Sequence, residues 1–445
     1  MPPIKLQVVS PSAGISCHAW NADKSMLALC ANDNRLQIYE GCNSPSFASW
    51  RLAHVLEEHD LVISGISWSP VTNKIVTCSH DRNAFVWSYD AAQAKWNPIL
   101  CALMLTRAAL DVHWSPSGTK FACSSGAKTI AVSRLDTSQG SDWYVSKLIK
   151  GHKSTVQKVA WHPNGLVLAT ACTDFKCRVV SAVVEEVDTN PDPRPFGIVK
   201  PFGEAYHQFS CGGWVTAVAW SPSGSILAYA GQDSTIHFVH FDPSGAVSEQ
   251  RVRYALLPVS SLAFLSEKAV VGGGHDMNPL VFTANSSGQW SFLRRLDEKS
   301  TGPAKAAGAV SSMSAARAMF QAKTTRGQAS SGGAGKDLWT QHANAIVGIE
   351  SMGRAGDPTC SKLSTCGELV LGRARPPSVF VSSRSGEGKE DERKTQGLTE
   401  GGGTHTDGTS GGRISVSVRV WRTRVSCAVL YFGGGSGGGD GSDGG

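Results

Sequence analysis

Several histidines have the chemistry of metal ligands or general acid–base catalysts, because imidazole titrates near neutral pH and binds metal ions readily. Those that could act together are His59, His80, His152 and His162. They fall in the second and fourth units of a sequence repeat described below, and those two units are not neighbours. The sequence therefore predicts no metal site, and the repeat favours a structural role for these histidines.

Two glycine-rich segments have the composition of phosphate-binding loops. Residues 332–336 end in Gly-Lys, but Ser330 occupies the position of the first motif glycine and Asp337 the position of the Ser/Thr. Residues 272–274 follow an expected strand, but Asn278-Pro279 soon afterwards cannot open the helix that a dinucleotide site needs. We expect the second segment to be a turn between strands, and neither segment predicts a cofactor.

Cysteines are the remaining candidate nucleophiles. Cys30, Cys78, Cys123 and Cys172 each fall near the end of an expected strand. Small, buried thiols at such positions act as hydrophobic packing residues. No catalytic residue is predicted, and the protein is not expected to be an enzyme.

The elements that position these residues repeat along the chain. A strand pattern that ends in Trp and continues with Ser-Pro or His-Pro occurs at residues 65–70, 111–116, 158–163 and 217–222, with weaker copies at 17–20 and 261–264. Its aromatic residues lie 48, 46, 47, 59 and 44 positions apart. A period in the mid-forties is typical of the blades of a β-propeller.

Each unit continues with a second strand, a tight turn that contains aspartate, and a third strand. The turn residues are Asp33, Asp81, Asp174 and Asp233. Aspartate suits such turns because its carboxylate accepts hydrogen bonds from nearby backbone N–H groups. An apolar residue follows six positions after each Asp, which is the register of WD repeats, and Gly151-His152 matches the Gly-His signature of that family.

WD repeats imply a structural role for the polar residues of the second unit. In such repeats a His, a Ser or Thr on the second strand, the turn Asp and the terminal Trp share one buried hydrogen-bonded set. We expect that set to be His59, Ser79, Asp81 and Trp87. His152, Asp174, Asp33 and Asp233 are expected to be blade residues of the same kind.

The predicted fold is an all-β, seven-bladed WD40 β-propeller, with low-complexity insertions before and within the last blade. Residues 1–298 are expected to form blades 1–6, and a strand at about residues 4–9 is expected to complete the last blade. The rest divides into an inserted loop at 299–336 with a short helix at about 313–321, the first part of blade 7 at 337–367, a low-complexity insertion at 368–413, a last strand at 414–426 and a disordered Gly-rich tail at 427–445. Because fifty residues inside a tight turn are unusual, we hypothesise that 368–413 is an unremoved intron or a gene-model artefact.

Composition limits the classes of function. The 445 residues include 12 Cys and carry a formal net charge of +6. There is no run of eighteen apolar residues and no signal-peptide pattern, so we expect a cytoplasmic protein without a membrane partner. The basic residues Lys147, Lys150, Lys153 and Lys158 form a local cluster in the sequence, but the small net charge does not favour nucleic acid.

Residues 15–21, 78–87 and 151–156 closely resemble subunit 1 of the actin-related protein 2/3 complex, a WD-repeat family. The resemblance implies a non-catalytic scaffold without a cofactor, in a seven-subunit assembly that nucleates branched actin filaments. The implied partners are actin-related proteins, small non-actin subunits, the actin filament and acidic nucleation-promoting peptides. The implied location is the cytoplasm and actin cytoskeleton, with a nuclear pool.

The insertion before the last blade also resembles this family, which carries a projecting helix there. Residues 316–321 resemble that helix, with Arg317 and Phe320 at matching positions. Met313, Ala316 and Phe320 would lie on one helical face, which suggests docking into a groove. Met313, Arg317 and Phe320 are thus the candidate partner-binding residues, and the alternative is a flexible loop with incidental apolar residues.

Two other functions stay open. A WD-repeat adaptor of another complex, such as a substrate receptor of a ubiquitin ligase, would be expected to carry an additional docking domain. A propeller hydrolase would require acidic residues or histidines that converge on the central channel. The turn aspartates are explained by blade structure alone.

Overall fold

A computed structural model of the chain describes residues 6–9, 14–43, 49–138, 142–189, 191–192, 194–296, 342, 344–352, 362–367 and 427–431. Chain contacts separate residues 370–423, none of which is described, from a unit made of residues 1–369 and 424–445. All that follows concerns that first unit. Its described part contains seven four-stranded antiparallel sheets and no α-helix.

The first three blades follow one another in the chain, each with its strands in sequence order. Blade 1 is β2 (Cys17–Trp20), β3 (Leu27–Cys30), β4 (Leu36–Glu40) and β5 (Arg51–Leu56). Blade 2 is β6 (Ile63–Trp68), β7 (Ile75–Ser79), β8 (Ala84–Asp90) and β9 (Lys95–Cys101). Blade 3 is β10 (Ala109–Trp114), β11 (Lys120–Ser125), β12 (Ile130–Asp136) and β13 (Trp143–Ile149).

The next three blades repeat this order. Blade 4 is β14 (Val156–Trp161), β15 (Val167–Cys172), β16 (Lys176–Ser181) and β17 (Ala205–Ser210). Blade 5 is β18 (Val215–Trp220), β19 (Ile226–Gly231), β20 (Thr235–Phe241) and β21 (Val247–Arg253). Blade 6 is β22 (Val259–Ser266), β23 (Ala269–Gly274), β24 (Leu280–Ala284) and β25 (Trp290–Arg295).

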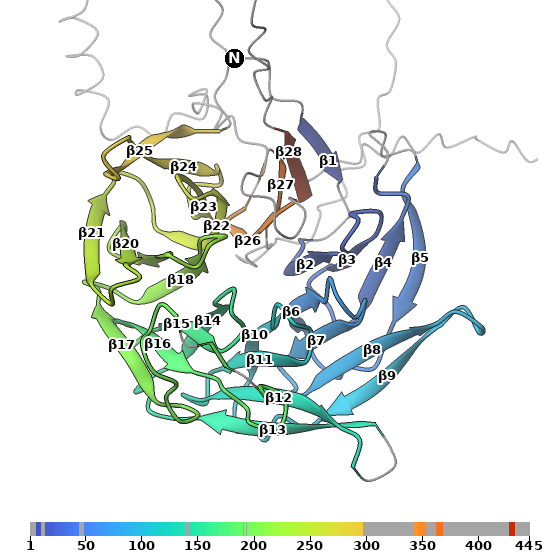
Figure 1. Cartoon of the computed structure of the whole chain (residues 1–445). Helices are drawn as coiled ribbons and strands as arrows, with labels where there is room; N and C mark the ends of the chain where they lie inside the picture. The colour runs from blue at the N-terminus through green and yellow to red at the C-terminus, as the bar shows by residue number, and fades with distance from the viewer. Residues whose placement is uncertain are drawn as a thin grey trace, which may run out of the picture. The chain divides into compact units, whose positions relative to one another are not determined.

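Blade 7 joins the two ends of the chain. It contains β26 (Ile346–Ser351), β27 (Lys362–Gly367), β28 (Cys427–Tyr431) and β1 (Leu6–Val9), in that order. The inner strands β2, β6, β10, β14, β18, β22 and β26 contact one another in turn, and β26 contacts β2, so the ring is closed (Figure 1). The predicted seven-bladed propeller is confirmed, and so is the N-terminal strand of its last blade.

Four expectations concern the late part of the chain, and the structure describes residues of only one of these segments. The strand that pairs with β27 is Cys427–Tyr431, so the expected Gly-rich tail at 427–445 begins with a strand and not with disorder. The expected last strand at 414–426 lies outside the described residues, as do the helix at 313–321 and the insertion at 368–413. A pattern of alternating residues could not decide which segment pairs with β27, because pairing depends on the neighbouring strands.

The expected turn at residues 272–274 is also wrong. These glycines end strand β23. A side chain at Gly273 would meet Ile346 Cγ2 of blade 7 at 2.5 Å, so glycine here permits blade 6 to pack closely on blade 7.

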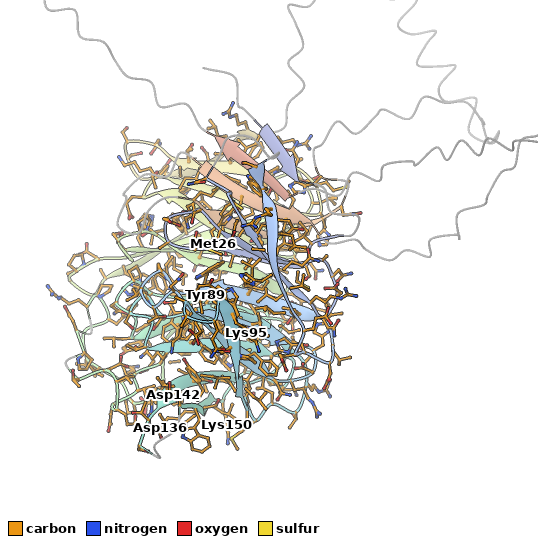
Figure 2. The ribbon with its side chains drawn as sticks, turned by 90° about the vertical axis from the view of Figure 1, so that its right-hand side faces the viewer. Met26, Tyr89, Lys95, Asp136, Asp142 and Lys150 are labelled. Atoms are coloured by element: carbon orange, nitrogen blue, oxygen red, sulfur yellow. The ribbon has the colours of Figure 1, made fainter. Side chains whose placement is uncertain are left out.

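The core consists of seven clusters of buried residues, one at each joint between neighbouring blades. The cluster at the joint of blades 1 and 2 includes Ile38 of blade 1 together with Trp68 and Trp96 of blade 2, whose rings meet edge to face with centroids 5.7 Å apart. At the closing joint, Ile15 and Trp20 of the first blade pack with Cys366 of the last. Removal of apolar surface from water between blades therefore holds the ring together. Figure 2 turns the ring by 90° and shows Tyr89 and Lys95 on blade 2.

Candidate functional site

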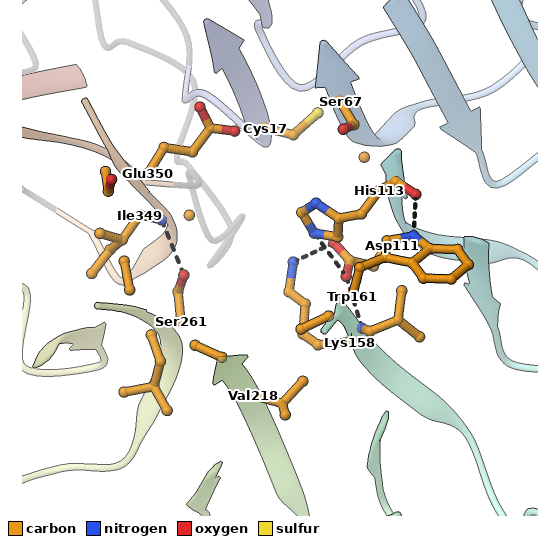
Figure 3. Close-up of a pocket in the computed structure, with 18 of the residues that line it drawn as sticks. Cys17, Ser67, Asp111, His113, Lys158, Trp161, Val218, Ser261, Ile349 and Glu350 are labelled. Atoms are coloured by element: carbon orange, nitrogen blue, oxygen red, sulfur yellow. Dashed lines mark hydrogen bonds and ion pairs between the residues drawn. The ribbon is translucent and has the colours of Figure 1, made fainter. Parts of the chain in front are cut away.

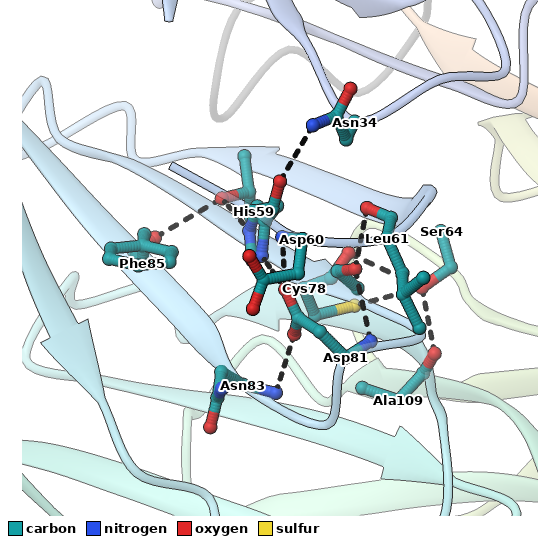
Figure 4. A network of polar contacts seen from close by, with 12 residues as sticks. Asn34, His59, Asp60, Leu61, Ser64, Cys78, Asp81, Asn83, Phe85 and Ala109 are labelled. Carbon is teal, nitrogen blue, oxygen red and sulfur yellow. Dashed lines mark hydrogen bonds and ion pairs between the residues drawn. The ribbon is translucent and has the colours of Figure 1, made fainter. Parts of the chain in front are cut away.

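The polar set of blade 2 is buried and internally satisfied. His59 precedes β6, and its Nδ1 lies 2.7 Å from Asp81 Oδ2 in the turn between β7 and β8 (Figure 4). His59 Nε2 lies 2.9 Å from Thr77 Oγ1, and the indole N–H of Trp87 donates to the same Thr77 oxygen at 3.0 Å. Burial lowers the pKa of His59, although the hydrogen bond and charge of Asp81 oppose this effect.

Ser79 does not belong to the set that we expected it to join. The hydroxyl that bridges His59 and Trp87 is that of Thr77. Ser79 Oγ instead donates to Leu61 O at 2.9 Å and accepts from the backbone N–H of Asp81 at 3.2 Å. Both residues lie on β7, two positions apart, and therefore on the same face of the strand, so the residue pattern alone could not distinguish them.

Blade 4 contains a variant of the same arrangement. His152 Nε2 lies 3.0 Å from Thr170 Oγ1. Asp174 in the following turn accepts two hydrogen bonds from Arg178, at 3.1 and 2.8 Å, and one from the backbone N–H of Lys153 at 3.1 Å. Burial would raise the pKa of Asp174, but Arg178 and these donors lower it to about 2. The carboxylate is thus a fixed structural anion.

The turn aspartates of blades 1 and 5 also bind their own blades. Asp33 Oδ1 accepts from the backbone N–H of Arg35 at 3.0 Å. Asp233 Oδ1 accepts from Thr235 Oγ1 at 2.5 Å, and its Oδ2 lies 3.1 Å from Arg251. Each predicted turn aspartate therefore sits in a blade turn and contacts blade residues.

Blade 5 also holds a group that the sequence did not reveal. Cys211 Sγ lies 4.0 Å from His237 Nε2, and His237 Nδ1 lies 2.7 Å from Glu249 Oε1. The order thiol, imidazole and carboxylate resembles a catalytic triad. Burial, however, raises the pKa of the Cys211 thiol, whereas a nucleophilic cysteine needs a lowered one. The thiol also contacts Asp233 and Thr235, so the group fits the structural position that His59 holds in blade 2.

The inner strands surround a central channel with a cavity of about 510 Å³. Its charged side chains come from three blades: Asp111 and His113 on β10, Lys158 on β14 and Glu350 on β26 (Figure 3). Lys158 Nζ lies 3.0 Å from Asp111 Oδ1, and Asp111 Oδ2 accepts from the backbone N–H of Val159 at 3.0 Å. Glu350 projects into the channel from the opposite wall (Figure 3).

The channel charges influence one another. Burial would raise the pKa of Asp111, but Lys158 and His113 hold it well below its usual range. Asp111 in turn raises the pKa of both Lys158 and His113 against the effect of burial. Burial raises the pKa of Glu350 to about 7, against the opposing effects of Lys24 and His113. The channel therefore holds Asp111 between two basic groups, Lys158 and His113, and the carboxyl group of Glu350, for which no ion pair within 4 Å is found among the described residues.

The basic cluster read from the sequence does not form one surface. Lys158 lines the channel, and Lys147 lies 3.0 Å from Glu186. Figure 2 shows Lys150 on blade 3, where Asp136 and Asp142 also lie. Lys147 and Lys158 are thus each paired with a carboxylate, and Lys158 belongs to the channel.

Cysteines and histidines in the described ranges give no further centre. Cys30, Cys78, Cys123 and Cys172 are buried, as expected. The described residues contain no group of three or more His, Cys, Asp or Glu arranged to hold a metal ion. His80 lies in the turn after β7, and His162 Nε2 lies 3.1 Å from Gly224 O. No helix in the described ranges is long and apolar enough to cross a membrane.

Sequence reasoning missed the channel residues, although a signal existed. In five innermost strands the residue immediately before the repeat aromatic is small: Ala19, Ser67, Ala160, Ala219 and Ala263. At the same position β10 carries His113 and β26 carries Glu350, which precedes Ser351 in place of the aromatic. At this position, two of the seven units carry a large ionisable residue and the other five carry a small one, which is an exception in an otherwise regular repeat. That exception becomes visible only when all seven units are aligned strand by strand.

Comparisons with known proteins agree with this architecture. The family model "WD domain, G-beta repeat" matches residues 50–88, 143–181 and 203–240. Actin-related protein 2/3 complex subunit 1B of Arabidopsis thaliana is 44% identical over 362 residues, which cover 79% of this chain and 91% of that protein. Subunit 1A-B of Xenopus laevis is 38% identical over 358 residues, with the same coverage of both chains. Subunit 1 of Schizosaccharomyces pombe is 38% identical over 285 residues, covering 63% of this chain and 73% of that protein. With this identity sustained over most of both chains, the protein belongs to the family of subunit 1 of the actin-related protein 2/3 complex.

Proposed function

We propose that this chain is a non-catalytic scaffold subunit of the actin-related protein 2/3 complex and supports nucleation of branched actin filaments. The observation that carries the proposal is the 44% identity that covers 91% of a relative named as subunit 1 of that complex. A closed ring suits this role, because it is rigid and protects its strand edges while it presents loops to partners. The comparisons do not favour an adaptor of a ubiquitin ligase.

The partners follow from membership of the complex: the actin-related proteins and the small non-actin subunits. Contact with the actin filament and with acidic nucleation-promoting peptides belongs to the same proposal, as does a location in the cytoplasm and actin cytoskeleton with a nuclear pool. Catalysis and cofactor binding are not part of it. The polar sets of blades 2 and 4 support a structural role, because their groups satisfy one another.

The proposed partner-binding residues of the insertion are still Met313, Arg317 and Phe320. They lie outside the described residues, so this part of the proposal rests on the resemblance alone. An Arg317→Ala, Phe320→Ala double variant should still enter the complex but should nucleate fewer branches in a pyrene-actin assay. A variant that nucleates branches as well as the wild-type chain would remove these residues from the proposal.

The test of the main proposal is purification of the chain, tagged at its N-terminus, from its native cells. Both actin-related proteins and four small non-actin subunits should be recovered in stoichiometric amounts. A chain lacking residues 1–13 is the matched control, because it loses β1 and thus one strand of blade 7. Recovery of a cullin-type ligase, or of the intact chain alone, would contradict the scaffold role.

The hypothesis of an artefact at residues 368–413 also remains. In blade 2 only residues 80–83 separate β7 from β8, whereas residues 368–426 separate β27 from its partner β28. Sequencing of transcripts tests the hypothesis directly. A transcript without this segment would support an unremoved intron, and intact transcripts in every case would refute it.

A further inference from the structure

The central cavity exists because most blades contribute a small side chain to it. The position before the repeat aromatic of each innermost strand, or before Ser351 in blade 7, is alanine or serine in five blades and ionisable only in blades 3 and 7. Blades 3 and 7 are as far apart around the ring as two of seven blades can be. His113 and Glu350 face one another across the opening (Figure 3). The cavity of about 510 Å³ is large enough for the end of a long side chain.

The charges in this cavity are not equivalent. Lys158 and Asp111 form an ion pair at 3.0 Å, and Asp111 also lies 3.4 Å from His113 Nε2. Among the described residues that line the cavity, Glu350 is the charged side chain that makes no ion pair within 4 Å. Lys24 and His113 are near enough to influence its pKa, but burial is the larger effect. A carboxyl group in such a position gains most from a cation that enters from outside.

Aromatic side chains line the same cavity. Trp68, Trp114, Trp161, Trp220 and Phe264 belong to its lining. Flat apolar walls suit the methylene stem of a long basic side chain, and aromatic rings attract its cationic end. An anionic guest would find the ammonium group of Lys158 already paired and would face the carboxyl group of Glu350.

We propose that the central channel binds a basic side chain, an arginine or a lysine, of a partner polypeptide, with the Glu350 carboxylate as the acceptor of its charge. The aromatic and small residues of the wall hold the stem of the guest. The Lys158–Asp111 pair stays intact and forms the opposite wall. This proposal concerns the channel alone and does not depend on which complex the chain enters.

The test uses the full chain and the probe N-acetyl-arginine amide, followed by calorimetry and by NMR. Saturable binding is expected, with a dissociation constant on the order of millimolar for so small a probe. Glu350→Gln should weaken binding at least tenfold, whereas Glu185→Gln, which changes an exposed carboxylate outside the cavity, should leave it unchanged. Binding should also be stronger at pH 8 than at pH 6, because Glu350 loses its proton in that interval.

A second variant keeps the proposal open to refutation if Glu350→Gln fails to fold. Ala219→Leu enlarges a lining residue on blade 5 and should also weaken binding at least tenfold, without any change in charge. Lack of saturable binding by the wild-type chain would overturn the proposal. Equal binding by the wild-type chain and a folded Glu350→Gln variant would overturn it too, as would preference for N-acetyl-aspartate amide.

Discussion

Trp20 donates its indole N–H to Ser364 Oγ at 2.9 Å, although 344 positions separate the two residues in the chain. Trp20 ends the innermost strand of blade 1, and Ser364 lies on the second strand of blade 7. His18 Nε2 lies 2.7 Å from the same oxygen. One buried hydroxyl group thus joins the first blade to the last at the point where the ring closes.

Ser364→Ala should therefore weaken ring closure. The change leaves the indole N–H of Trp20 and one nitrogen of His18 without their partner in a buried site, and such a loss costs about 1–3 kcal/mol. Chemical denaturation should show this decrease in the free energy of unfolding. Ser244→Ala, in an exposed loop, is the control and should change it by less than about 0.5 kcal/mol. Equal stability of the two variants would show that the shared hydroxyl does not hold the closure.

A second prediction separates Thr77 from Ser79. Thr77→Val keeps the side-chain shape but removes the oxygen that accepts from Trp87 and contacts His59. We expect a loss of about 1–3 kcal/mol and a marked change in the NMR signal of the Trp87 indole proton. Ser79→Ala should leave that signal in place, since Ser79 bonds to Leu61 and Asp81. If Ser79→Ala moved the signal instead, Ser79 would belong to the buried set, as the residue pattern predicts.

These two residues show how far the sequence could predict the blade sets. Fixed positions of the repeat hold His59, Asp81 and Trp87, so the contacts that join them in one buried set could be predicted. Thr77 and Ser79 are chemically similar and lie on one face of β7, so the choice between them depended on the depth of each in the blade. Glu350 was predictable as a channel residue only from a strand-by-strand alignment of all seven units, and its place opposite His113 depends on the closure of the ring from both ends of the chain. The pairing of β28 with β27 was missed for the same reason.

Gly273 gives a prediction about the joint of blades 6 and 7. A Cβ atom there would lie 2.5 Å from Ile346 Cγ2 and 2.8 Å from Ile349 Cδ1. Gly273→Val should force the blades apart and destabilise the protein by about 1–3 kcal/mol, as overpacking does in a close-packed core. Thermal unfolding measures the effect. Gly126→Ala is the control, because its nearest neighbour would be 3.5 Å away, at ordinary contact distance. A Gly273→Val variant as stable as this control would refute the close packing.

Buried histidines predict how stability depends on pH. Burial, with further contributions from nearby cations at two of the sites, lowers the pKa of His18, His152 and His342 to about 4 from 6.5. Between pH 6.5 and 4 the unfolded chain therefore binds more protons at these sites than the folded ring, and stability falls as the pH falls.

Glu350 acts in the opposite direction. Its folded pKa of about 7 exceeds the ordinary value of 4.5, so its contribution is fully present below pH 4.5 and is lost as the pH rises through 7. Between pH 4.5 and 6.5, Glu350 offsets the change in stability that about one of the three histidines causes. Urea unfolding should thus show decreasing stability from pH 6.5 to 4.5, with a steeper decrease for Glu350→Gln than for the wild-type chain. A slope that is the same for both would show that Glu350 ionises in the ring as it does in the unfolded chain.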